Sequence, residues 1–229
     1  MQISLKFGKS LCLLSGFLFL MNTAGRAQYT NNPEYEQLQG GLVAGLNFSQ
    51  VDGDGYKGYH KSGFSGGGIL YLPFGNNVGL PFDATIALSM EVLYEQKGAH
   101  GSGAVGYTSV TAQDIRLHYA EVPIQINLFR GTNKSNFGMG LAVGYLGFSE
   151  ETITQGSHTQ LKNALPFHKF DLSYVLTANI HVFHGLFISP RFEYSLISVR
   201  NNNSAEFGGR DQQFNNTVAL RLMYLISQK

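Results

Sequence analysis

Hydrophobic and polar positions alternate with a period of two along most of the chain. The clearest run covers residues 84–94, where every second residue is apolar and the residues between them are mostly small or polar. The same alternation returns over 137–145, 170–182 and 217–226. Because successive side chains of a β-strand point to opposite faces, this pattern predicts strands that are apolar on one face.

The alternation predicts eight strands joined by connections of unequal length. The predicted strands cover 40–51, 63–74, 84–97, 115–130, 137–149, 167–183, 186–199 and 214–226. The connections at 52–62, 98–114, 150–166 and 200–213 are long, whereas those at 75–83, 131–136 and 184–185 are short. Long loops at one end and short turns at the other are typical of outer-membrane β-barrels. An even number of strands would place both termini at the short-turn, periplasmic end.

Strand length distinguishes a membrane barrel from a soluble β-sandwich. Sandwich strands average about 5–6 residues, whereas strands that cross a bilayer need about 9–11. The predicted strands are of the longer kind. Composition agrees, since the chain holds 28 Gly, 12 Tyr and 17 Phe and only 14% of its residues are charged. The predicted fold class is therefore all-β: an eight-stranded antiparallel transmembrane β-barrel with up-and-down meander topology.

The first 27 residues have the three-part layout of a secretory signal peptide. Lys6 and Lys9 precede an apolar run over 11–20, and a more polar stretch ends at the small residue Ala27. The apolar run is too short for a spanning helix, which needs about 20 residues. We expect cleavage near Ala27, a flexible periplasmic tail over 28–39 and a barrel domain over 40–229, in the outer membrane of a Gram-negative-type bacterium.

Cysteine usage and charge exclude several classes of function. The single cysteine, Cys12, lies within the expected signal peptide, so the mature chain would hold no disulfide, thiolate metal site or cysteine nucleophile. The formal net charge is +1 and no basic stripe occurs, which argues against a nucleic-acid partner. We expect no cofactor.

If the apolar face of each strand meets lipid, the other face must line the barrel interior. This assigns nine charged residues to the interior: Glu91, Glu95, Arg116, Glu121, Lys169, Asp171, Arg191, Glu193 and Arg221. An eight-stranded barrel has room for side chains but hardly for a channel, and an isolated buried charge is costly. We therefore predict a lumen plugged by paired charges, centred on Glu91, Glu121, Arg191 and Arg221. The alternative is a pore for ions or small solutes.

Aromatic residues predict where the two membrane interfaces lie. One predicted group near the short turns contains Phe74, Phe129, Phe137, Phe183 and Phe187, and a second nearer the long loops contains Tyr94, Tyr119, Tyr145, Phe148 and Phe170. Two such girdles are typical of membrane barrels. Within 115–130 the apolar positions change from odd to even numbers between Tyr119 and Val122, which predicts a β-bulge there. Pro123 would be tolerated at such a break in pairing.

Two loop motifs offer partial chemistry. Asp52-Gly53-Asp54-Gly55 resembles the start of a calcium loop, but the remaining acidic ligands are absent at the expected spacing. His100, Ser102 and Asp114 supply the residue types of an acyl-chain hydrolase on an outer rim. Scattered loop residues do not form a catalytic constellation, so we predict a protein that is not an enzyme and has no metal site.

Several segments resemble the PorT-like family of small outer-membrane β-barrels found in Bacteroidetes-type bacteria. The resemblance lies in residues 41–48 and 91–99 and in Tyr119-Ala120-Glu121-Val122-Pro123, which is similar to the family signature Tyr-x-Glu-Ile-Pro. Tyr119, Glu121 and Pro123 are the signature residues. The final residues, 226–229, depart from the aromatic ending of many such barrels.

The resemblance implies a location and a set of partners. It implies insertion into outer-membrane lipid by the barrel assembly machinery. Because the family takes its name from a member linked to protein secretion and maturation, it also implies an envelope or secretion partner. The expected role is an accessory to secretion or envelope assembly, or an action through extracellular loops.

Overall fold

The computed structural model describes residues 38–76, 84–102, 110–130, 135–155, 158–161, 166–201 and 212–226. The expected signal peptide, and the expected tail up to residue 37, lie outside the described residues. The strands are β1 (Gln39–Asp52), β2 (Lys61–Asn76), β3 (Ala84–Ser102), β4 (Val110–Arg130), β5 (Asn136–Gln155), β6 (His158–Leu161), β7 (Phe170–Phe183), β8 (Leu186–Ser195), β9 (Arg200–Asn201) and β10 (Gln212–Ile226). Among the described residues, no helix has the length and apolar character needed to cross a membrane.

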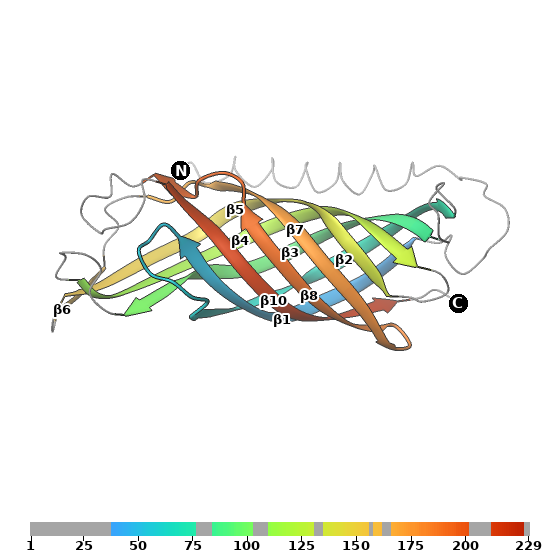
Figure 1. The fold of residues 1–229 in the computed structure, drawn as a ribbon, viewed down its shortest axis with the longest axis horizontal. Helices are drawn as coiled ribbons and strands as arrows, with labels where there is room; N and C mark the ends of the chain where they lie inside the picture. The colour runs from blue at the N-terminus through green and yellow to red at the C-terminus, as the bar shows by residue number, and fades with distance from the viewer. Residues whose placement is uncertain are drawn as a thin grey trace, which may run out of the picture. The chain divides into compact units, whose positions relative to one another are not determined.

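Eight of the strands close into one antiparallel ring (Figure 1). The order is β1-β2-β3-β4-β5-β7-β8-β10, and β10 pairs back with β1 over thirteen residue pairs from Gly40↔Ile226 to Asp52↔Phe214. Closure matters because a closed barrel leaves no row of unpaired backbone groups to face lipid. The predicted eight-stranded antiparallel meander is confirmed.

The strands reach further at the long-loop end than the sequence predicted. β3 continues to Ser102, β4 begins at Val110 and β5 continues to Gln155, where it pairs with the short strand β6. The predicted long connections 98–114 and 150–166 were wrong to that extent, since much of each is strand. Strand periodicity is weak in these glycine- and threonine-containing segments, but their backbone groups still pair with a neighbouring strand.

The tightest connection is the turn between β7 and β8. His184 adopts a φ of 46°, in the left-handed region, and Gly185 follows it. A Cβ atom at Gly185 would lie 2.2 Å from the backbone oxygen of Leu225. The predicted two-residue turn therefore needs glycine at its second position because β10 passes close beside it.

The outer wall carries a continuous apolar surface. On β5, the outward residues Met139, Leu141 and Val143 are each about half exposed, and Leu220 and Leu222 repeat this on β10. Their neighbours in sequence point inward, as the alternating burial of both strands shows. A wall of this kind is stable in contact with lipid rather than water.

The predicted β-bulge in β4 was wrong. Odd-numbered residues of β4 point inward from Gln113 to Asn127, so Ile115, Leu117 and Tyr119 are buried inside the barrel instead of facing lipid. The bulge lies on β5, where His118 pairs with Phe148 and Tyr119 with Leu146, leaving Gly147 as the extra residue.

The interior of the barrel is apolar at the long-loop end because the outside there is polar. Ile115 and Leu117 point inward, while Asp114, Arg116 and Glu150 point outward or lie at the rim. A barrel wall that faces water buries its apolar side chains inside, as in a soluble protein. The rule that apolar side chains face outward therefore applies only within the apolar band.

Three of the aromatic residues predicted for the girdles lie inside the barrel. Tyr119 and Phe187 are buried in the interior and Phe129 packs there beside Tyr71, so these three were assigned to the wrong face. Of the predicted residues, Phe137 and Phe183 point outward towards the short turns, and Tyr94, Tyr145, Phe148 and Phe170 point outward towards the long loops. The side chain of Phe74 lies outside the described part of the chain.

Candidate functional site: the closed interior of the barrel

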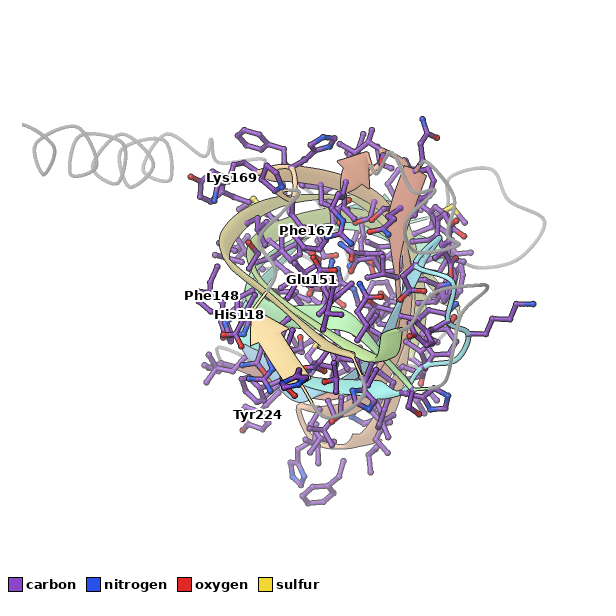
Figure 2. All side chains as sticks on the ribbon, turned by 90° about the vertical axis from the view of Figure 1, so that its left-hand side faces the viewer. His118, Phe148, Glu151, Phe167, Lys169 and Tyr224 are labelled. Carbon is purple, nitrogen blue, oxygen red and sulfur yellow. The ribbon has the colours of Figure 1, made fainter. Side chains whose placement is uncertain are left out.

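Side chains fill the barrel from wall to wall in three layers. Figure 2 looks into the long-loop end, where Phe167 and Glu151 lie inside the ring and His118, Phe148, Lys169 and Tyr224 lie outside it. The lower cluster, towards the short turns, contains Val43, Ile69, Tyr71, Ala87, Leu93, Phe187, Met223 and Leu225. The upper cluster contains Val51, Ala99, Ile115, Leu117, Tyr119, Leu146, Phe167 and Val199. Between these two apolar clusters lies a charged layer.

Arg191 on β8 is the centre of the charged layer. Its Nη1 lies 3.1 Å from Glu91 Oε2, and its Nη2 lies 2.7 Å from Glu121 Oε1 and 3.1 Å from Glu193 Oε2. These side chains are at most 4% exposed. A guanidinium suits this position because its planar set of donors can contact several carboxylates at once.

Arg221 on β10 extends the layer towards the lower cluster. Its Nη1 donates to Glu91 Oε2 at 2.8 Å, and its Nη2 donates to Ser189 Oγ at 3.1 Å. The other oxygen of Glu91 accepts from Gln125 at 3.0 Å. Glu91 therefore contacts two arginines and an amide, which compensate its buried charge.

Lys97 on β3 is a member of the layer that the sequence reasoning missed. Its Nζ lies 2.5 Å from Glu121 Oε2, also contacts Glu193, and sits 5.3 Å from the ring centroid of Tyr119. The signal was present, because Lys97 has the same odd-numbered phase as Glu91 and Glu95. The predicted strand ended at this residue, so its side chain was not assigned to a face.

Two acids of the layer form no ion pair with a base in the described part of the chain. Glu95 accepts a hydrogen bond from Ser65 Oγ at 2.6 Å and another from the Asn47 amide. Asp171 Oδ2 accepts from Ser195 Oγ and from Asn215 Nδ2, both at 2.9 Å.

Of the nine charged residues predicted to line the interior, the structure brings seven inside and leaves two outside. Arg116 is 55% exposed and contacts Asp114 at 2.9 Å and Glu150 at 3.8 Å. Lys169 is exposed on the outer surface just before β7 (Figure 2). Both predictions were wrong for the same physical reason. These residues lie beyond the apolar band, where the outer surface is polar.

The three signature residues all point inward from β4. Tyr119 faces the upper cluster and its hydroxyl accepts from Asn215 at 3.2 Å, while Glu121 joins Arg191 and Lys97. Pro123 is buried where two residue pairs are missing from the β3–β4 ladder. The register is the same on both sides of the gap. Proline has no N–H to donate, so Pro123 itself adds no unpaired donor at this interruption.

A separate ion pair lies on the long-loop side of the upper cluster. Arg200 Nη1 lies 2.7 Å from Glu151 Oε2, and both side chains are buried. The Arg200 guanidinium also stacks 4.3 Å from the ring centroid of Phe167. The charged layer therefore lies between two apolar clusters, with a further ion pair towards the long-loop end.

The partial motifs at the rim do not assemble into a catalytic or metal site. His100 Nδ1 lies 3.3 Å from Asp114 Oδ1, but Asp114 also binds Lys61 at 2.7 Å and Arg116. Ser102 takes no part in these contacts among the described residues. The same part of the chain contains no group of three or more His, Cys, Asp or Glu residues arranged to hold a metal.

The side chain of Asp54 forms a hydrogen bond within its own loop. Its Oδ1 accepts a hydrogen bond from the Tyr56 N–H at 2.9 Å, and its side chain is buried in the connection between β1 and β2. Burial raises the pKa of Asp54 to about 6. Asp52 accepts instead from Gln50 and Asn216. Asp54 therefore stabilises the loop from within, and Asp52 links the end of β1 to Asn216 on β10.

Comparison with known proteins identifies a family for this architecture. Residues 26–201 match the family model described as "Outer membrane protein beta-barrel domain". No curated protein matches the chain. The match does not reach the level of the PorT-like group, which stays a prediction.

Solved structures similar to this chain include Ail and Neisserial surface protein A. Ail, the attachment invasion locus protein of Yersinia pestis, is 15% identical over 82% of this chain and 98% of its own, with a TM-score of 0.46. Ail has also been solved with the heparin analogue sucrose octasulfate. Neisserial surface protein A is 8% identical over 82% of this chain and 99% of its own, with a TM-score of 0.42.

Proposed function

The chain belongs to the outer membrane protein β-barrel domain family, and from that premise we propose that it is a non-enzymatic barrel whose lumen is plugged by paired charges. It is an outer-membrane β-barrel protein. A plugged barrel transports nothing through its interior. Its activity would then lie in the parts that extend outside the lipid.

The contact of Arg191 with three carboxylates is the observation that best supports the plug. Its contacts with Glu91, Glu121 and Glu193 join strands β3, β4 and β8 across the interior. Ions would have to displace this network before they could pass. Breaking a buried ion pair by removing one partner costs about 3–5 kcal/mol, so such an opening is rarely populated.

Planar-bilayer conductance of the refolded protein tests the plug. We expect no openings from the parent and intermittent openings from Glu91→Ala and Arg221→Ala, which remove opposite charges from the same contact. Arg116→Ala is the matched control because Arg116 lies on the exposed rim. Stable openings from the parent would contradict the plug and would favour the alternative, a pore for ions or small solutes.

The proposed partner is a protein of the envelope or of a secretion system. Support comes from the resemblance to the PorT-like family and from the extension of β3, β4 and β5 beyond the apolar band. Residue-specific crosslinking in living cells tests this, with a photoreactive side chain at Lys57 in the β1–β2 loop and a control at Leu141 in the apolar band. A protein crosslinked at Lys57 but not at Leu141 would support a partner, whereas crosslinks to lipid alone at both positions would argue against one.

A further inference from the structure

The charged layer holds more acid than base. Its members are the acids Glu91, Glu95, Glu121, Asp171 and Glu193 and the bases Lys97, Arg191 and Arg221, all at most 4% exposed. Five carboxylates against three cations leave an excess of two negative charges in this layer of the described interior. A buried charge without compensation costs several kcal/mol, so a proton or a cation is expected to accompany the excess.

One carboxylate oxygen in the layer stands apart from the others. Both oxygens of Glu91, Glu121 and Glu193 contact arginine, lysine or amide donors. Both oxygens of Glu95 accept hydrogen bonds from neutral donors. Asp171 Oδ2 accepts two hydrogen bonds, but Asp171 Oδ1 is buried and accepts none from the described part of the chain.

Two other buried oxygens lie on β10, the strand whose Asn215 contacts Asp171. Asn215 Oδ1 and Thr217 Oγ1 are also buried without a hydrogen-bond partner among the described residues, and both point inward from β10. Asn215 is in direct contact with Asp171 through its amide nitrogen. The residue opposite Asp171 on β5 is Gly144, and a Cβ atom there would lie 3.2 Å from the ring of Tyr119 and 3.6 Å from Asp171 Cβ.

We propose that Asp171 Oδ1 is the anionic ligand of one small monovalent cation of the Na⁺ class, with Asn215 and Thr217 supplying neutral oxygens beside it. Carboxylate, amide and hydroxyl oxygens are the ligands that hard cations prefer. A divalent ion fits less well, because calcium takes 6–8 oxygens with several carboxylates and the described residues form no acidic group of that kind. The cation neutralises part of the excess charge in the layer.

The inference rests on the proposed plug, because only a closed interior retains an ion. The full chain is refolded in detergent with radioactive sodium, passed through a gel-filtration column in sodium-free buffer, and counted. We expect one sodium ion per folded chain for the parent and none for Asp171→Asn. Asp114→Asn is the control, since Asp114 is a partly exposed carboxylate at the rim, and it should retain as much sodium as the parent.

A stability measurement covers the case in which Asp171→Asn fails to fold. The parent is refolded in sodium chloride or in choline chloride at equal ionic strength, and the choline cation is too large for the site. We expect a higher Tm in sodium for the parent, and a smaller difference for Thr217→Val, which keeps the charge of Asp171 but removes a neutral oxygen.

Four outcomes would overturn the inference or separate it from the plug. Equal stability in both salts with no retained sodium overturns it. Stability that follows pH but not the cation means that a proton compensates the charge instead. If the parent conducts in planar bilayers and also loses sodium, the plug itself is wrong. If the parent is silent and loses sodium, only the cation site is wrong.

Discussion

Arg191 contacts three of the five acids of the charged layer, so its loss should be severe. Arg191→Met keeps much of the apolar volume but leaves Glu91, Glu121 and Glu193 with fewer partners. We expect a loss of about 3–5 kcal/mol in the free energy of unfolding, measured by urea titration in lipid vesicles. Arg116→Met at the exposed rim should cost less than about 1 kcal/mol.

A double variant separates charge from packing at the same position. In Arg191→Met with Glu121→Gln, one of the carboxylates that lost its partner no longer carries a charge. We expect this pair of changes to restore part of the lost stability, because the penalty comes from uncompensated charge. A double variant as unstable as the sum of the two single variants would indicate that the contact contributes through shape alone.

The loop carboxyl of Asp54 should make stability depend on pH. Its pKa is about 6 in the folded protein against a model value of 3.8, chiefly because it is buried. Between these two values the unfolded chain binds fewer protons than the folded one, so stability falls as pH rises. The loss is at most about 3 kcal/mol, and it is complete above pH 6. The check is denaturant unfolding at a series of pH values.

Asp54→Asn serves as the comparison for this titration, because an amide cannot ionise. We expect the variant and the parent to be similarly stable below pH 4, and the variant to be the more stable of the two above pH 6. A difference between them that stays constant from pH 4 to 7 would show that Asp54 does not titrate in this range.

The elements of the barrel were predictable because each strand had to be apolar on one face. Alternation identified the eight strands of the ring, including β3 and β7, and it identified Glu91 and Arg191 as inward residues. It failed on β4, where Ile115 and Leu117 are apolar but face inward. Sequence periodicity states which residues share a face, but not whether lipid or water lies outside it.

The bulge on β5 is the element-scale feature that periodicity could not locate. Up to Leu146 the even-numbered residues of β5 point inward, and beyond the bulge Glu151 and Ile153 do so. The extra residue, Gly147, has no side chain to reveal the change of phase. Without this shift Glu151 would point outward, away from Arg200.

Deleting Gly147 should keep the ion pair between Glu151 and Arg200, because the strand then alternates without a bulge after Leu146 and Glu151 still points inward. In the parent, a double-mutant cycle with Glu151→Gln and Arg200→Met should give a coupling energy of about 0.5–3 kcal/mol. In the deletion variant the coupling should be about the same. Gly147→Ala is the control, because a Cβ atom there meets nothing closer than the His118 oxygen at 3.7 Å. Coupling close to zero in the deletion variant would contradict this placement of the bulge, because the deletion of a regular strand residue would turn Glu151 outward.

At the scale of the whole molecule, the outer surface fixes how the barrel sits in lipid. Outward residues are apolar through the middle of the wall, and polar or charged residues such as Arg116 and Thr152 follow at the long-loop end. The interior shows the opposite trend, with charge in the middle and apolar side chains above. The two trends together mark the boundary between lipid and water near Tyr119 on β4 and Leu146 on β5.

This boundary predicts how the stability cost of an introduced charge depends on its depth in the membrane. Leu141 lies at the centre of the apolar run 137–145 on β5 and is 51% exposed, so Leu141→Arg places a charge in the middle of the hydrocarbon. We expect a loss of about 2–4 kcal/mol in the free energy of unfolding, measured in lipid vesicles. Thr152→Arg, beyond the boundary on the same strand, should cost at most about 1 kcal/mol. Leu141→Ala is the control that measures the stability lost with the leucine side chain alone. Equal costs for the two arginine variants would mean that the apolar surface does not face lipid, because only a hydrocarbon environment makes the penalty depend on position along the strand.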